Sequence, residues 1–168
     1  MNDEQQVKEK SFVEEFGLVF QQLGFPRMAG RIVGWLLLCN TPHQSIDELA
    51  EALMASRGSI STMTHLLIQV GLVERFCLPG VRHDYFRIRH GASQQLLKRR
   101  AEQIAMLRQL AERGLELLGD KATVTRQGLE EMRDMYAFFE QEFPVLVERW
   151  EQAQPKGQSQ LVQKGGNQ

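Results

Sequence analysis

Between residues 45 and 89 the apolar residues change their spacing, and this change limits the possible folds more than any other feature. The spacing is helical as far as Gly71, and glycine commonly follows the last turn of a helix. Beyond it, Pro79-Gly80 separates two short runs with aromatic and β-branched residues. The segment therefore combines helices with a β-hairpin.

Each of the two helices in this segment has a start signal. Ser45 and Glu48 have the spacing of a capping box, in which serine caps the helix and glutamate reaches back three residues later. Ser56 is a good N-cap for a second helix. We predict helices over 45–54 and 57–70, and strands over 72–78 and 83–89.

Two further helices precede this segment. The first is amphipathic, with phenylalanines at helical spacing, and ends at Gly24. The second begins near Pro26 and is apolar nearly all round, so we expect it to be central and buried. Gly30 and Gly34 give it one smooth face for close packing. A set of helices followed by a two-stranded hairpin is the order of a winged helix-turn-helix, and the fold class is mainly α.

The remainder is predicted to be helical, with long C-terminal helices that serve dimerisation. The last helix carries seven apolar residues with the alternating spacing of a heptad repeat: Leu129, Met132, Tyr136, Phe139, Phe143, Leu146 and Trp150. The alternative is that this stripe covers the chain's own first helices. Pro144 should kink or locally break the helix.

These patterns divide the chain into four parts. They are an N-terminal helix (1–24), a winged helix-turn-helix (25–91), a helical dimerisation region (92–154) and a disordered tail (155–168).

The helix over 57–70 has the features of a helix that reads DNA in the major groove. Short hydroxyl side chains crowd its start, and they let the helix N-terminus approach phosphates closely. The alternative is that these residues only cap the helix or face solvent. The candidate contacts are Ser56, Arg57, Gly58, Ser59, Ser61, Thr62, His65 and Gln69.

The hairpin adds a second candidate contact. We expect residues 79–87 to act as a wing on a flanking groove or on phosphates, through Arg82 and His83. A solvated turn is the alternative. Arg87 fits either a phosphate contact or an internal ion pair equally well.

The charge of the chain agrees with a local rather than a global basic surface. The 168 residues have a net charge of −1, yet residues 57–90 hold five arginines against two acids. A winged-helix protein-interaction module that does not bind DNA is therefore the competing function.

Other site classes have little support. Cys39 and Cys77 stand in apolar surroundings and are expected to be buried free thiols of a reducing compartment, rather than a disulfide. No metal-ligand spacing or catalytic constellation is present, so we expect no metal, no cofactor and no enzyme activity. The polar N-terminus and the short apolar runs predict a cytoplasmic protein without a membrane segment.

Several runs of sequence resemble the GbsR-type branch of the MarR-like winged-helix transcription regulators. They are GFPRMAGRIVGWLLL, SIDELAEALMASRGSISTMTHLLIQVGLVERF, PGVRHDYFRI and LEEMRDMYAFFEQEFPVLVERW. The resemblance covers about residues 12–150. It implies a homodimeric regulator, most often a repressor, that binds a pseudo-palindromic operator on double-stranded DNA. It also raises the prospect of a small-molecule effector of unknown identity.

Overall fold

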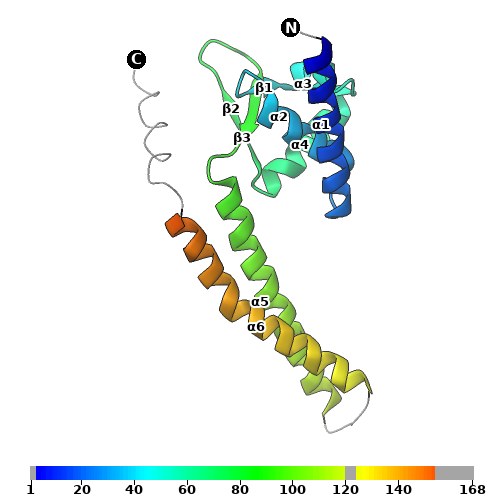
Figure 1. Ribbon diagram of the computed structural model, residues 1–168, viewed down its shortest axis with the longest axis vertical. Coiled ribbons are helices and arrows are strands. Elements are labelled where there is room, and N and C mark those ends of the chain that lie inside the picture. Colours follow the sequence, from blue (N-terminus) through cyan, green and yellow to red (C-terminus); the bar gives the residue numbers. More distant parts are fainter. Residues whose placement is uncertain (1–2, 120–123, 154–168) are drawn as a thin grey trace. The chain divides into compact units, whose positions relative to one another are not determined.

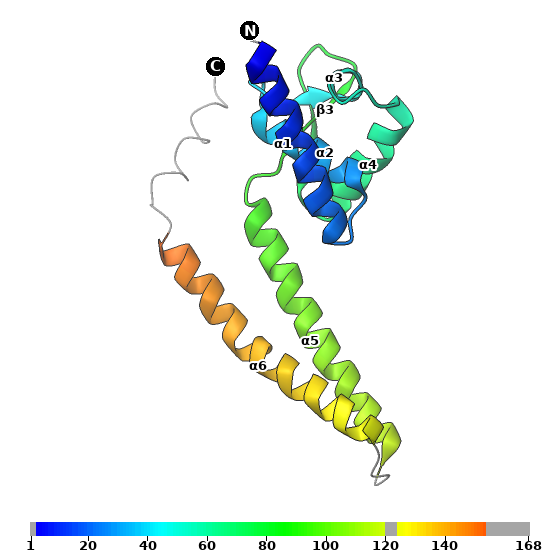
Figure 2. The ribbon, with the colours of Figure 1, turned by 45° about the vertical axis from the view of Figure 1, so that its right-hand side comes forward.

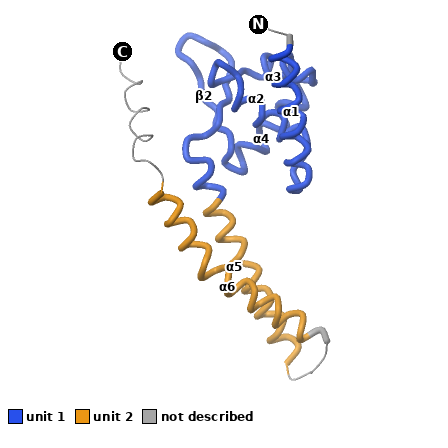
Figure 3. Tube along the Cα trace, viewed as in Figure 1, with its two compact units in different colours: residues 1–96 blue, residues 97–168 orange. Residues whose placement is uncertain are grey.

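The computed structural model of the chain describes residues 3–119 and 124–153. They fall into two compact units, residues 1–96 and residues 97–168, shown in blue and orange in Figure 3. The structure is mainly helical with one small antiparallel sheet, which confirms the predicted fold class. The predicted disordered tail, residues 155–168, lies outside the described residues. The predicted four-part division stays a prediction.

Nine elements follow one another along the described chain (Figure 1). They are α1 (Asp3–Gln22), α2 (Arg27–Leu38), β1 (Gln44–Ser45), α3 (Ile46–Ala52), α4 (Arg57–Gln69), β2 (Val73–Cys77), β3 (Asp84–Ile88), α5 (Ala92–Leu118) and α6 (Val124–Ala153).

Helices α1 and α2 lie side by side in the first unit, as Figures 1 and 2 show. Their contact depends on the absence of side chains at two glycines. A Cβ atom added to Gly30 would lie 2.6 Å from the Cβ of Phe20, and one added to Gly34 would lie 3.0 Å from the Cβ of Phe16. The smooth face predicted for α2 is therefore where the aromatic side chains of α1 pack.

Helix α2 is central, as predicted. Its buried side chains join those of α3, α4 and the sheet in one hydrophobic core. The largest fully buried side chains of this core are Ile32, Leu49, Ile60, Thr64, Leu67 and Val73.

The start signals of α3 and α4 are confirmed. The Ser45 hydroxyl accepts a hydrogen bond from the backbone N–H of Glu48, and the Glu48 carboxylate accepts from the backbone N–H of Ser45 at 2.6 Å. The carboxylate also accepts from the Ser45 hydroxyl at 2.7 Å, and the two hydrogen bonds that it accepts hold the pKa of Glu48 below its ordinary value. Ser56 caps α4 by accepting from the N–H of Ser59 at 3.2 Å. The capping residues thus set where both helices begin.

The sheet has three strands in the order β1-β3-β2, rather than the two predicted. The two strands of the hairpin lie within one residue of their predicted bounds, and Gly80 has a φ of 80°, which glycine adopts without strain. The additional strand β1 is only two residues long and pairs Gln44 with Phe86 and Ser45 with Tyr85. Ser45 is therefore a strand residue and a helix cap at once, which couples β3 to the start of α3.

The second unit contains most of α5 and all of α6, which run antiparallel (Figure 2). Leu129 packs against Gly114, where a Cβ would lie only 3.0 Å from a methyl carbon of the leucine. Arg108 and Glu140 form an ion pair between the two helices. Helix α6 continues through Pro144, so the local break expected there does not occur.

Candidate nucleic-acid interface

Helix α4 has one buried and one exposed face, as predicted. Ile60, Thr64 and Leu67 have no exposed surface and anchor the helix in the core. The opposite face consists of four exposed residues: Gly58, Thr62, His65 and Gln69. Two other candidates of this helix, Ser59 and Ser61, are half-buried beside that face. The polar half of α4 is thus accessible along its length.

The hydroxyl and imidazole groups of α4 bond back to the helix itself. The Thr62 hydroxyl donates to the carbonyl oxygen of Gly58 at 2.9 Å. Both Thr64 Oγ1 and His65 Nδ1 lie 3.0 Å from the carbonyl oxygen of Ser61. Among the hydroxyl residues at the start of α4, only Ser56 caps the helix. The orientation of Thr62 and His65 is fixed by these bonds.

Arg57 begins α4 and forms an exposed ion pair with Asp47 of α3. Its Nε lies 2.9 Å from Oδ1 of the aspartate, and the two side chains are 73% and 64% exposed. An exposed pair of this kind contributes little to stability. The sequence did not predict the ion pair with Asp47, because Asp47 was recognisable only as part of the capping sequence of α3.

The hairpin presents Arg82 and His83 at its exposed end, beyond the Pro79-Gly80 turn. Within the described residues Arg82 forms no ion pair. The imidazole of His83 packs against the ring of Tyr85, with 4.8 Å between the ring centres. Both side chains are therefore accessible to solvent at the end of the hairpin.

Arg87, whose role the sequence left open, is held by its own hairpin. Its Nε lies 2.6 Å from Oε1 of Glu74, and its guanidinium lies 4.6 Å from the ring centre of Phe76. Arg75 forms a similar pair with Asp84 at 3.2 Å. Part of the local positive charge is therefore neutralised within the hairpin.

The cysteines differ from the prediction in one respect. Both are free, and Cys39 is half-buried, which raises the pKa of its thiol. Cys77, however, is exposed. Its thiol donates to Oδ1 of Asp84 at 3.2 Å, and this hydrogen bond raises its pKa. The expectation of a buried Cys77 was wrong because alternate residues of an edge strand such as β2 face solvent.

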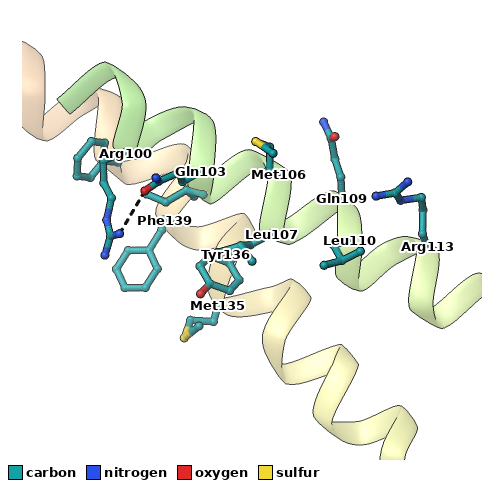
Figure 4. A pocket seen from close by; sticks show the side chains of 12 residues that line it. Arg100, Gln103, Met106, Leu107, Gln109, Leu110, Arg113, Met135, Tyr136 and Phe139 are labelled. Atoms are coloured by element: carbon teal, nitrogen blue, oxygen red, sulfur yellow. Dashed lines mark hydrogen bonds between the residues drawn. The ribbon is translucent and has the colours of Figure 1, made fainter. Parts of the chain in front are cut away.

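The predicted stripe on α6 is only partly covered within one chain. Leu129, Met132, Tyr136 and Phe143 are half-buried, whereas Phe139, Leu146 and Trp150 are exposed. Between α5 and α6 there is an open groove of about 760 Å³. Figure 4 shows Tyr136 beside Leu107 in this groove, with Phe139 farther along the same helix.

Exposed apolar side chains continue on both helices beyond the groove. On α5 they include Leu117, at 89% exposed, and on α6 they include Phe138, at 60% exposed. A soluble monomer rarely leaves so many large apolar side chains exposed on one element pair.

Metal sites and membrane-spanning helices are both absent from the described residues. No three histidine, cysteine, aspartate or glutamate side chains there come together as a metal site would require. No helix in residues 3–119 or 124–153 is both long enough and apolar enough to cross a membrane.

The chain is similar to proteins named as transcriptional regulators. Residues 91–153 match a family described as MmpR5-like MarR family transcriptional regulator. The HTH-type transcriptional regulator MmpR5 of Mycobacterium tuberculosis is 42% identical over 141 residues, which are 84% of this chain and 86% of that protein. A solved structure described as a transcriptional regulator is 41% identical, with a TM-score of 0.74 over 86% of this chain and 99% of that one.

These similarities agree with the resemblance to MarR-like regulators and do not confirm the GbsR-type branch. The named relatives are regulators rather than enzymes.

Proposed function

The chain belongs to the MarR family of transcriptional regulators, and we propose that it acts as a homodimeric repressor on a pseudo-palindromic operator. Helix α4 lies in the major groove in this proposal, as the second helix of a helix-turn-helix does. We assign the contacts to the candidates on α4, namely Ser56, Arg57, Gly58, Ser59, Ser61, Thr62, His65 and Gln69.

The observation that carries this proposal is the division of α4 into two faces. Ile60, Thr64 and Leu67 are fully buried, so the helix cannot roll, and Thr62 and His65 on the opposite face are exposed. The first turn of α4 contains no acidic residue of its own. Such a helix start attracts phosphate.

In this proposal the wing, residues 79–87, contacts a flanking groove or phosphates. Arg82 is the main cation there, with His83 beside it. Arg87 takes part only if it exchanges Glu74 for a phosphate. The ion pair with Glu74 favours its structural role, so we rank Arg82 above Arg87.

Homodimerisation is proposed from the apolar surface of the second unit. A two-fold dimer presents two reading helices about one helical turn of DNA apart, which is what a pseudo-palindrome requires. The proposed interface consists of Leu129, Met132, Tyr136, Phe139, Phe143, Leu146 and Trp150. Burial of their exposed portions by a second copy would remove the apolar surface from water.

The same proposal covers the compartment, the absence of enzymatic activity, an effector and the branch of the family. The protein works in the cytoplasm, where a bacterial-type operator would be reached, and has no enzymatic activity. A small-molecule effector modulates DNA binding, and its identity is open. The resemblance to the GbsR-type branch, some members of which respond to choline-like ligands, also stays a prediction. Titrating choline-like cations against the DNA complex tests it.

The competing function is a protein-interaction module that does not bind DNA. The salt dependence of DNA binding distinguishes the two functions. DNA affinity that comes from phosphate contacts falls linearly with the logarithm of salt concentration. Binding of the full chain to a random-sequence duplex pool should therefore weaken steeply as salt rises.

Variants locate the contacts in that experiment. We expect Arg57→Ala and Arg82→Ala each to weaken binding and to reduce the salt slope by about one. Lys8→Ala, which removes an exposed cation near the start of α1, serves as the matched control. Binding without salt dependence, or equal effects of all three variants, would contradict the proposal.

A further inference from the structure

Two exposed side chains on α4 each place a polar group against a carbonyl oxygen of their own helix. Thr62 uses its hydroxyl proton on the carbonyl oxygen of Gly58, at 2.9 Å. His65 Nδ1 lies 3.0 Å from the carbonyl oxygen of Ser61. A carbonyl oxygen only accepts hydrogen bonds, so this contact is a hydrogen bond when Nδ1 carries the ring proton. In that neutral tautomer, Nε2 is a lone-pair acceptor.

The exposed face of α4 therefore presents acceptors at these two positions. Phosphate oxygens are acceptors as well, so neutral His65 and Thr62 have nothing to offer the DNA backbone. The major groove offers two kinds of hydrogen-bond donor, the N6 amino group of adenine and the N4 amino group of cytosine.

We propose that His65, through Nε2, reads an exocyclic amino group of adenine or cytosine in the operator, with Thr62 as a second acceptor. This inference rests on the proposed function, since it requires α4 to lie in the major groove. The proposal separates the polar residues of α4 into hydrogen-bond acceptors, which read bases, and donors, which bind phosphate. In the described part of the chain the hydroxyls of Ser59 and Ser61 make no hydrogen bond, so these two keep a proton for phosphate.

The assignment differs from what a protonated histidine would do. An imidazolium donates from both nitrogens and would bind phosphate, or the N7 and O6 acceptors of guanine. The two cases predict opposite responses to the removal of one amino group from the DNA. An imidazolium carries a proton on both ring nitrogens, whereas the neutral ring proposed here carries one on Nδ1 only.

The first test needs no DNA. Nitrogen-15 NMR of the labelled full chain at alkaline pH, where histidine is neutral, distinguishes the protonated ring nitrogen from the bare one. The His65 signals are assigned from the spectrum of His65→Gln. We expect the proton on Nδ1. A proton on Nε2 would overturn the proposal whether or not the protein binds DNA.

The second test uses a duplex recovered from a random pool by the full chain. Purine in place of adenine, or 2-pyrimidinone in place of cytosine, removes only the amino group at one position. We expect wild-type affinity to fall about 2- to 10-fold at the position read by His65, the range for one lost neutral hydrogen bond. His65→Ala should bind more weakly and be indifferent to that substitution.

Controls separate the inference from the proposed function. His90→Ala removes another exposed histidine, outside α4, and should respond as the wild type does. Thr62→Val should lose sensitivity at a neighbouring position. If His65→Ala keeps the wild-type response at every amino group, the reading assignment is wrong although the protein still binds DNA. Failure of the pool to yield any preferred duplex would refute both the function and the assignment.

Discussion

Nε of Arg57 lies 2.9 Å from Oδ1 of Asp47, so the cation at the start of α4 is held beside the first turn of α3. In the proposed complex the same guanidinium contacts a phosphate, and the aspartate would then repel the DNA. We predict that Asp47→Asn raises DNA affinity about 2- to 5-fold at low salt, a gain within the energy of an exposed pair.

The measurement is fluorescence anisotropy with a labelled duplex at two salt concentrations. Glu4→Gln is the control, because it removes a similarly exposed, ion-paired carboxylate at the start of α1. A gain of the same size in both variants would attribute the effect to net charge alone. No gain in Asp47→Asn would mean that Arg57 contacts no phosphate.

The close contact of α1 and α2 predicts opposite effects of one substitution at two glycines. Gly30→Ala places a Cβ 2.6 Å from the Cβ of Phe20 and 2.8 Å from the backbone oxygen of Phe16. We expect a loss of about 1–3 kcal/mol in the free energy of unfolding, as for other overpacked cores. Gly128→Ala meets no atom within 4 Å in α6 and should gain about 0.5–1 kcal/mol. Denaturant unfolding followed by circular dichroism compares them, and equal values would contradict the contact.

The capping box predicts a pH-dependent contribution to stability. The pKa of Glu48 is lowered in the folded protein by hydrogen bonds from the backbone and hydroxyl of Ser45. The charged form therefore stabilises the fold above the ordinary carboxyl pKa, and this contribution disappears as the pH falls through the lowered value. Glu48→Gln should cost below about 1 kcal/mol at neutral pH, since the carboxylate is exposed, and nothing in strong acid.

The experiment measures the free energy of unfolding of wild type and variant at neutral pH and in acid. Glu51→Gln, on the same helix, is the control. A cost of Glu48→Gln that persists at low pH would mean that the charge of the carboxylate is not what stabilises the helix start.

The exposed part of the α6 stripe predicts the oligomeric state. Phe139→Glu combined with Leu146→Glu places two charges on a surface that a dimer would bury, and we expect a monomer at micromolar concentration. Sedimentation velocity is the measurement, with circular dichroism to verify the helices. Gln141→Glu, an exposed change on the same helix, should leave the dimer intact.

A double variant that stays dimeric would exclude this stripe as the main interface. The exposed apolar residues of α1 would then be the next candidates. Val19 of α1 and Leu23 directly after it, at 52% and 66% exposed, are suitable sites for the same charge substitution.

The sequence was sufficient to predict the structure wherever an interaction between residues close in the chain determines it. The capping box, the Ser56 cap, the glycine after α4 and the Pro79-Gly80 turn act within a few residues, and all are found as predicted. The buried face of α4 followed from spacing alone. Local rules therefore placed the candidate reading helix and its exposed side.

The sequence was insufficient where partners lie far apart along the chain. Strand β1 is two residues long, too short for any periodicity, and exists because β3 offers its edge. The ion pairs of Arg57 and Arg87 depend on the packing of α3 and on the register of β2 with β3. The hydrogen bond that fixes His65 depends on its rotamer, which spacing does not specify.

The shared position of Ser45 in β1 and at the head of α3 has a consequence for how such proteins can diversify. Length can change at the Gly80 turn, where a Cβ would meet nothing, and the reach of the hairpin would then vary. An insertion beside Ser45 would instead slip the strand register and the helix start together. The reach of the hairpin can thus vary while α3, which begins at Ser45, keeps its place beside β3.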